Sequence, residues 1–400
     1  MYGIVRHGTR STARCLGLRT TASLPAFNRT IIRQTNPTVP KTNITRSIIQ
    51  QKGFSTTKIG QFSQEPTSRT SDDEDGSDHT NFARRSMLYV PGSSDKMIKK
   101  SQNSEADCII FDLEDSVAQH RKGAARESVF HGLNAAPRPG PELAVRINPP
   151  SGDQNLANDD LDVILPSTAL NTIVVPKVES IDDVLFIMDK IQYHRSSAPK
   201  NHFKKISLVL SIESANSLLR MQSIIEEFQE EVHGRELVDN VQIGALLFAS
   251  EDYCASTGII RSKTRKELHF PRAHMATIAK AYDLQAIDMV CIDYKDLEYL
   301  QEEAQEGRSF GFDGKQAIHP AQVETIQKFF TPGEKEVERA AKIKFAYQKS
   351  VQDDKGAVGF VEGESMIMID APMLKQADAV LAKARAAGLS IPDVSSIKTS

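Results

Sequence analysis

Short apolar runs recur along the chain from about residue 86 onward, and longer segments of mixed polar and apolar residues with helical spacing separate them. Near-continuous apolar runs are typical of strands buried on both faces of a parallel sheet. Because strands and helices alternate, the pattern predicts an α/β fold. The runs lie at 86–90, 108–113, 143–148, 172–177, 207–213, 241–249, 286–292 and 315–319.

Eight strand–helix units within about 240 residues favour one closed (β/α)8 TIM barrel. A doubly wound open sheet fits part of the same pattern and is the alternative architecture. After the barrel, residues 331–349 predict a long helix, 353–364 a glycine-containing loop, and 365–372 an apolar stretch before a final Ala-rich helix. We therefore expect a catalytic barrel over 81–330 and a C-terminal helical module over 331–400 that acts as a lid or a subunit arm.

The N-terminal segment has a composition unlike the rest of the chain. Residues 1–64 contain ten of the 49 Lys and Arg residues and no Asp or Glu, and they are rich in Ser and Thr. Such a segment is typical of a mitochondrial presequence and predicts delivery to the matrix; a merely basic disordered tail is the alternative. Residues 71–78 carry too many acidic and too many small side chains to form a core. We therefore interpret 1–80 as a targeting leader followed by a solvated acidic linker.

Charge and cysteine usage exclude several classes of protein. Residues 65–400 hold 39 basic and 52 acidic side chains, a formal charge of about −13, which argues against a nucleic-acid partner. No apolar run approaches the roughly 20 residues that span a bilayer, so no membrane partner is expected. The cysteines are scattered (Cys15, Cys108, Cys254, Cys291), which favours reduced, mostly buried thiols over disulfides or zinc. Dinucleotide-binding, Walker, zinc-protease and serine-hydrolase fingerprints are also missing.

Polar residues follow most of the predicted strands, at the end where barrel enzymes place their active sites. The two best candidates for a metal site are Glu213, which ends the fifth run, and Asp252, which follows the sixth. Two carboxylates together with water and substrate oxygens would suit Mg²⁺. Helix capping by either carboxylate is the alternative, and spacing alone does not decide between the two.

Arg146 lies in an otherwise apolar strand and needs an anionic partner if it is buried. A substrate carboxylate or thioester oxygen would serve, through charge-assisted hydrogen bonds. A structural salt bridge to Glu114 or Asp115 is the alternative. Both interpretations remain open at this point.

Cationic residues gather near the first two strands. Lys96 and Lys100 lie four residues apart on one face of a predicted helix, and Arg121 with Lys122 forms a second pair. Together with the N-terminus of that helix they could hold a polyphosphate ligand. Ordinary solvated surface lysines are the alternative.

Asp370 is a lone carboxylate after the apolar stretch near the C-terminus. An apolar environment would raise the pKa of its carboxyl toward the range that is useful for proton transfer. A helix cap is the alternative.

Eight sequence motifs occur in order and together resemble the citrate lyase β-subunit-like branch of the HpcH/HpaI aldolase superfamily. The resemblance covers about residues 84–390. The motifs are 85–92 (RSMLYVPG), 111–115 (FDLED), 146–148 (RIN), 175–180 (VPKVES), 212–215 (IESA), 250–253 (SEDY), 314–320 (GKQAIHP) and 368–372 (MIDAP). Ser250 departs from the glycine that many relatives have before Glu-Asp, and we expect no loss of metal binding from it.

The resemblance implies a TIM barrel, dependence on Mg²⁺, a CoA-thioester substrate and a homotrimer. It implies that Glu213 and Asp252 bind the metal, that Arg146 binds substrate, and that Asp370 is the acid/base and reaches the active site of a neighbouring subunit. The implied CoA-thioester contacts are Tyr89, Lys96, Lys100, Arg121, Ile318 and His319.

The activity implied by the resemblance is cleavage of (3S)-citramalyl-CoA into pyruvate and acetyl-CoA, with a weak malate or citramalate synthase side activity. A sister specificity for malyl-CoA or another β-hydroxyacyl-CoA is one alternative. A non-catalytic barrel that binds CoA esters is the other.

Overall fold

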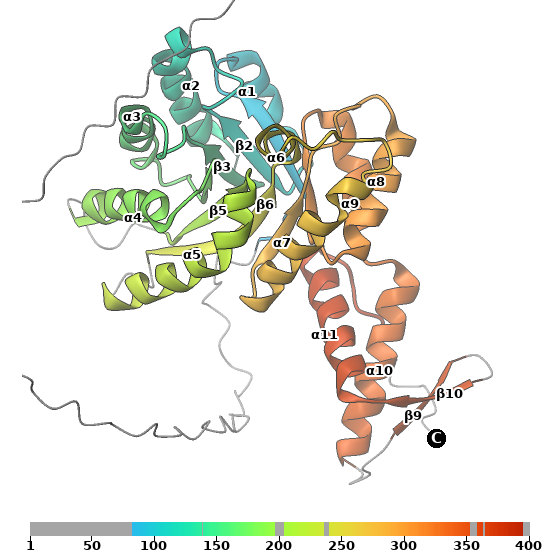
Figure 1. Cartoon of the computed structure of the whole chain (residues 1–400). Coiled ribbons are helices and arrows are strands. Elements are labelled where there is room, and N and C mark those ends of the chain that lie inside the picture. The colour runs from blue at the N-terminus through green and yellow to red at the C-terminus, as the bar shows by residue number, and fades with distance from the viewer. Residues whose placement is uncertain are drawn as a thin grey trace, which may run out of the picture. The chain divides into compact units, whose positions relative to one another are not determined.

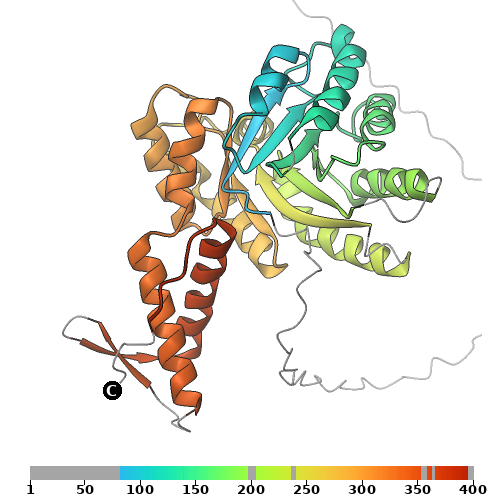
Figure 2. The same ribbon diagram turned by 180° about the vertical axis from the view of Figure 1, so that it is seen from behind.

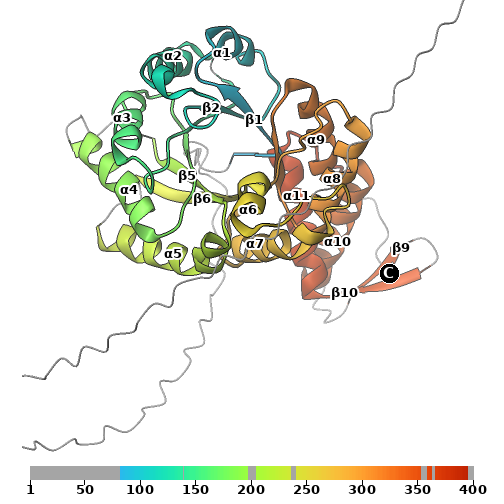
Figure 3. The same cartoon turned by 45° about the horizontal axis from the view of Figure 1, so that its top comes forward.

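The structure is a computed structural model, and it describes residues 82–137, 139–196, 204–235, 240–352, 358–362 and 365–394. The predicted leader and acidic linker lie outside these residues. Eight parallel strands form a closed barrel in sequence order, and β1 pairs with β8 to complete it (Figure 1, Figure 3). The predicted (β/α)8 barrel is confirmed, and the open-sheet alternative is wrong because the first and last strands are hydrogen-bonded.

The strands begin and end within a few residues of the predicted runs. They are β1 (Ser86–Pro91), β2 (Cys108–Asp112), β3 (Glu142–Arg146), β4 (Thr172–Val175), β5 (Ile206–Ile212), β6 (Val241–Phe248), β7 (Gln285–Asp288) and β8 (Gly314–Ala317). Helices surround them: α1 (Asp95–Ser101), α2 (Lys122–Ala135), α3 (Gln154–Ile164), α4 (Ile181–Ser196), α5 (Ala215–Gly234), α6 (Ser250–Thr257), α7 (His269–Ala281), α8 (Leu297–Ser309) and α9 (Val323–Phe330).

Side chains alternate along the strands, so the barrel has two apolar layers. The inner layer fills the barrel with small and branched residues, among them Ile110, Val174 and Ile287. The outer layer packs the strands against the helices and includes residues such as Phe111 and Phe248. Because both faces of each strand are covered, nearly every strand residue is apolar, and this explains the short apolar runs in the sequence.

A buried polar cluster closes the barrel at the N-terminal ends of its strands. Arg84, just before β1, donates to both carboxylate oxygens of Glu142, with the shortest distance 2.7 Å, and to Gln285 and Ser207 at 2.9 Å. Gly244 on β6 leaves room for this cluster, since a Cβ there would stand 2.1 Å from the Ser207 hydroxyl. The barrel, predicted to begin at 81, therefore begins within a few residues of Arg84, which closes its N-terminal end.

The C-terminal module consists of α10 (Glu334–Gln352), the antiparallel strands β9 (Val358–Glu362) and β10 (Ser365–Ile369), and α11 (Ala371–Ala386). The two helices pack side by side around their own apolar cluster (Figure 1, Figure 2). The predicted loop over 353–364 is wrong in part, because 358–362 forms β9. Ion pairs tie the module to the barrel: Lys383 to Asp313 at 3.0 Å and Arg308 to Glu336 at 2.8 Å.

Membrane-spanning helices and the state of the cysteines can both be followed in the described residues. No helix among them is long and apolar enough to cross a membrane. Cys108, Cys254 and Cys291 are buried free thiols, as predicted, whereas Cys15 lies outside the described residues.

Candidate active site

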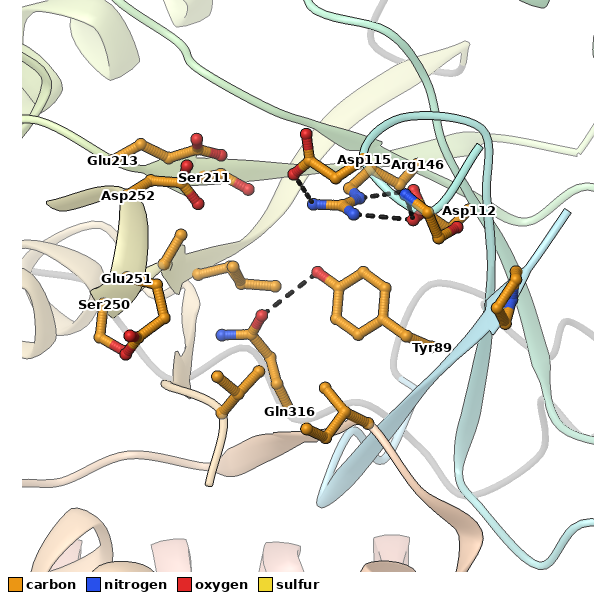
Figure 4. Close-up of a pocket in the computed structure, with 16 residues that line it drawn as sticks. Tyr89, Asp112, Asp115, Arg146, Ser211, Glu213, Ser250, Glu251, Asp252 and Gln316 are labelled. Atoms are coloured by element: carbon orange, nitrogen blue, oxygen red, sulfur yellow. Dashed lines mark hydrogen bonds and ion pairs between the residues drawn. The ribbon is translucent and has the colours of Figure 1, made fainter. Parts of the chain in front are cut away.

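A cavity of about 410 Å³ opens at the C-terminal ends of the strands (Figure 4). Its wall is formed by residues of β1, β2, β3, β5, β6 and β8, by residues of the loops after the strands, and by the first residues of α6. Arg146, Glu213 and Asp252, three of the predicted site residues, all line it. The expectation that the polar strand ends converge is therefore confirmed for these three.

Glu213 and Asp252 lie on one side of this cavity, which also carries Glu251 (Figure 4). Neither caps a helix: Ser214 caps α5 with its hydroxyl, and α6 begins after Ala249 without a side-chain cap. The capping alternative is thus wrong for both. Burial raises the pKa of Glu213 to about 7, and the neighbouring Glu114 and Asp252 add to this. A buried carboxylate beside other carboxylates has a strong tendency to take up a cation or a proton.

The donor set fits a magnesium ion that keeps part of its water shell. Among the described residues, no group of three or more His, Cys, Asp or Glu side chains is arranged to hold a metal by protein ligands alone. Mg²⁺ commonly binds through one or two carboxylates and fills its other positions with water and substrate oxygens. Glu213 and Asp252 supply such a pair, whereas zinc would favour His and Cys ligands.

Arg146 ends β3 and faces several carboxylates. Its Nε and Nη2 donate to the two oxygens of Asp112 at 2.7 and 2.8 Å, and its Nη1 lies 2.9 Å from Glu114 and 3.4 Å from Asp115. The ring of Tyr89 covers the guanidinium at 5.0 Å. The alternative of a structural salt bridge to Glu114 or Asp115 is confirmed, since both contacts form, but Asp112, which nothing in the sequence singled out, provides the bidentate partner. Arg146 also lines the cavity, so the substrate-binding role is compatible with the structural one.

Lys177 lies between the two groups of carboxylates. Its ammonium bonds to Glu114 and lies 4.0 Å from Glu213. Its backbone adopts a left-handed conformation (φ 50°), and its backbone amide donates to the carboxylate of Glu213. Despite this lysine and Arg146, burial raises the pKa of Glu114. The residues that line the cavity include five carboxylates and one cation, Arg146, and an excess of negative charge of this kind suits a cation site.

Tyr89 and Gln316 both line the cavity, and their side chains point toward one another (Figure 4). The Tyr89 hydroxyl donates to the Gln316 amide oxygen at 3.2 Å, and the Gln316 amide nitrogen donates to the backbone carbonyls of Phe248 and Asp288. Burial raises the pKa of Tyr89, so its hydroxyl stays protonated. Gln316 was not predicted; its position within the 314–320 motif was the available signal.

A second cavity, of about 290 Å³, adjoins the first and shares Tyr89, Pro91 and Ile318 with it. Lys100 and His319 line it too, so four of the six predicted CoA contacts surround this space. The His319 ring accepts from the Ala321 amide and stacks on Tyr294, with ring centroids 4.6 Å apart.

The other predicted phosphate contacts lie outside both cavities. Lys96 is exposed on α1, and Arg121 donates to the Ser93 carbonyl at 3.3 Å. The expectation for Lys122 is wrong: it is buried, and its ammonium donates at 2.7 Å to each of three oxygens, in Leu113, Glu114 and Asn148. Because those bonds occupy all three of its N–H groups, Lys122 is a structural cation.

Asp370 lines neither cavity. It is exposed at the start of α11, and its carboxylate accepts from the Met373 amide at 2.9 Å. The helix-cap alternative is therefore confirmed, and within one chain the Asp370 side chain is exposed.

Comparisons with known proteins agree with this fold. Residues 85–320 match the HpcH/HpaI aldolase/citrate lyase family. The chain is 35% identical to human mitochondrial citramalyl-CoA lyase over 306 residues, 75% of this chain and 85% of that protein. It is 30% identical to the citrate lyase subunit beta of Escherichia coli K12, over 76% of this chain and 95% of that protein. The CitE protein of Mycobacterium tuberculosis, solved with magnesium, acetoacetate and coenzyme A, has a TM-score of 0.55 and 25% identity, and the match covers 76% of this chain and 98% of that one. The chain belongs to the HpcH/HpaI aldolase/citrate lyase family.

Proposed function

We propose that the protein is a Mg²⁺-dependent lyase that cleaves (3S)-citramalyl-CoA into pyruvate and acetyl-CoA. Its family makes the chain a CoA-thioester carbon–carbon lyase. The observation that carries the specific proposal is the arrangement of Glu213 and Asp252 opposite Arg146 in one cavity, next to a second cavity that contains Lys100 and His319. Identity to a citramalyl-CoA lyase at 35% supports the choice of substrate.

Glu213 and Asp252 would hold the metal ion. The chemistry that a bound Mg²⁺ supplies is Lewis-acid polarisation of the substrate hydroxyl and carboxylate oxygens, which makes the hydroxyl proton easier to remove. Magnesium in the related M. tuberculosis structure is consistent with this assignment. Lys177 bonds to Glu114 and lies near Glu213, and its positive charge would offset the repulsion between these carboxylates before the ion binds.

Arg146 would stabilise the enolate oxygen of acetyl-CoA that develops when the carbon–carbon bond breaks. The guanidinium has a fixed orientation in a partly buried site, and a preorganised charge of this kind stabilises a developing anion without reorganisation. Tyr89 packs on its face and shields it from water.

The CoA part of the substrate would occupy the second cavity. Lys100 lines it, and Lys96 lies one turn earlier on the same helix, where it could meet phosphate groups at the entrance. His319 and Ile318 would contact the thioester arm where the two cavities meet, and Arg121 would add a further cation. The related M. tuberculosis protein was solved with coenzyme A, in support of this part of the proposal.

Asp370 would be the acid/base that protonates the enolate carbon, supplied by another copy of the chain in a homotrimer. The module that carries Asp370 is tied to the barrel through Asp313, which precedes β8, whereas the cavity lies at the opposite, C-terminal ends of the strands. A second copy is therefore the simplest source of this carboxylate. In reverse, Asp370 would remove a proton from acetyl-CoA, and this gives a weak malate or citramalate synthase activity.

The proposed location is the mitochondrial matrix. The basic, acid-free leader has the composition of a presequence. The human relative is a mitochondrial protein.

The test is to mix purified protein with citramalyl-CoA and to follow pyruvate release, first with Mg²⁺ and then with EDTA. We expect release that requires the metal and that is lost in Glu213→Gln. Malyl-CoA, followed by glyoxylate release, measures the sister specificity, because one methyl group shifts selectivity by only about 1–3 kcal/mol. Faster turnover of malyl-CoA would replace the proposed substrate. Binding of CoA esters without turnover would identify a non-catalytic barrel.

A further inference from the structure

Among the contacts of Arg146, Asp112 alone makes a bidentate one, and it therefore does most to orient the guanidinium. Two of the five guanidinium N–H groups, on Nε and Nη2, meet the two oxygens of this carboxylate at 2.7 and 2.8 Å. Such a two-bond fork fixes both the position and the plane of the guanidinium. The contact with Asp115 is longer, 3.4 Å, and Glu114 shares its carboxylate with Lys177.

Asp112 is itself held rigidly. It is the last residue of β2 and is 2% exposed. Each of its oxygens accepts one more hydrogen bond, from the amides of Glu114 at 3.0 Å and Ser116 at 3.1 Å. Burial raises the pKa of this carboxyl, but the hydrogen bonds and charge of Arg146 outweigh that effect and leave the pKa below its usual value.

The fork leaves one end of Arg146 for a ligand. With Nε and Nη2 held by Asp112 and one face covered by Tyr89, Nη1 lies 2.9 Å from the buried Glu114 and directs its other side toward the exposed carboxylate of Asp115 (Figure 4). Asp115 is 57% exposed, so a bound anionic oxygen could take its place at Nη1 at little cost.

We propose that Asp112 is a positioning residue for the lyase reaction, which holds Arg146 so that Nη1 meets the developing enolate oxygen. The proposal rests on the function proposed above. An asparagine at this position accepts only one of the two fork hydrogen bonds, and its NH₂ group would face an N–H donor of Arg146 or of the backbone. The guanidinium would then rotate away from its present plane, and a displacement of about 1 Å can lower a rate on the order of 100-fold.

The experiment compares Asp112→Asn with Asp112→Glu and with the control Asp115→Asn, which leaves the fork intact. For Asp112→Asn we expect kcat to fall about 100-fold with a smaller change in KM, because an interaction made in the transition state is lost. Asp112→Glu should recover about tenfold of that loss, and Asp115→Asn, which removes one long contact of Nη1 but keeps the fork, should lower kcat by less than Asp112→Asn does. Binding of Mn²⁺ in place of Mg²⁺, followed by EPR, should be unchanged in all three.

A double variant separates positioning from a structural role. If Asp112 acts through Arg146, the D112N/R146A protein should have the kcat of R146A within about threefold. Additive losses would overturn the proposal, as would a D112N protein with wild-type kcat. Equal loss of activity, Mn²⁺ binding and melting temperature in D112N and D112E would show a structural residue only and would overturn it too.

A spectroscopic measurement makes the result independent of turnover. In protein labelled with ¹⁵N-arginine, the Nε–H signal of Arg146 is identified by its absence in R146A, and it should exchange faster with water in D112N but not in D115N. An unchanged signal in D112N would overturn the proposed fork. Wild-type protein that shows the fork but cleaves no thioester would instead reject the proposed function.

Discussion

At the residue scale, Glu213 destabilises the metal-free fold at neutral pH. The pKa of its carboxyl rises from 4.5 to about 7, so the folded state binds this proton more tightly than the unfolded chain does. The contribution of Glu213 to stability is therefore largest below pH 4.5, falls as the pH rises, and is fully lost above pH 7. In EDTA at pH 8, Glu213→Gln should raise the free energy of unfolding by up to about 3 kcal/mol. Urea unfolding measures this difference.

The same variant separates stability from metal binding. Mg²⁺ should stabilise the wild type, because a ligand that binds only the folded state raises its stability, but it should not stabilise Glu213→Gln. Glu251→Gln is the matched control, since Glu251 lines the same cavity but is half-exposed and paired with Arg261. An equal Mg²⁺ response in wild type and Glu213→Gln would contradict the metal assignment.

The sequence predicted the site residues that stand out from apolar surroundings, and it missed Asp112 and Gln316, which do not. Arg146 could be identified because it interrupts an apolar run, and Glu213 because it ends one. Asp112, Glu114 and Asp115 lie within four positions, and only the path of the backbone decides which of them makes the bidentate contact with Arg146. Lys122 was misjudged for a related reason: its acceptors are mostly backbone carbonyls, which leave no mark in the sequence.

At the element scale, the closed N-terminal end of the barrel depends on Arg84. Its guanidinium joins β3, β5 and β7 through Glu142, Ser207 and Gln285. Arg84→Ala would leave the Glu142 carboxylate buried without its counter-ion, and breaking a buried pair in this way costs about 3–5 kcal/mol. We expect a loss of that size in urea unfolding. A chain that begins at residue 86 should lose at least as much.

A compensating variant tests whether the buried charge causes the loss. Arg84→Met combined with Glu142→Leu removes both charges and should recover most of the stability, since apolar residues often replace a buried ion pair without loss. An exposed surface pair contributes less than about 1 kcal/mol to stability. If Arg84→Ala lowered the free energy of unfolding by no more than that, Arg84 would not be the residue that holds the N-terminal end of the barrel together.

The elements themselves could be predicted to the extent that local pattern determines them. The barrel strands are buried on both faces, so each is an apolar run that can be recognised on its own. Among the described residues, β9 and β10 pair only with each other. Val358, Phe360 and Val361 favour a strand, but the glycines at 356, 359 and 363 made the stretch resemble a loop, and pairing with β10 is what the sequence did not show.

At the scale of the whole molecule, the barrel and the C-terminal module divide the proposed chemistry between them. The cavity with Arg146, Glu213 and Asp252 lies at the C-terminal ends of the strands, whereas the module is held by Asp313 before β8 and by Arg308 at the end of α8. This arrangement separates Asp370 from the cavity of its own chain. The sequence alone could not show the separation, because it depends on which end of the barrel the module contacts.

If one chain supplies Asp370 to the cavity of another, two inactive variants should restore each other. Asp370→Ala keeps its metal site but donates no acid, whereas Glu213→Gln donates Asp370 but holds no metal. In trimers mixed at random from equal amounts, about a quarter of the sites combine an intact Glu213 with a donated Asp370, so pyruvate release should return to about a quarter of wild type. Each variant reassembled alone is the control and should stay inactive. Since no mixed site could form if each chain used its own Asp370, a mixture that stays inactive although its chains have exchanged would show that every chain serves its own cavity.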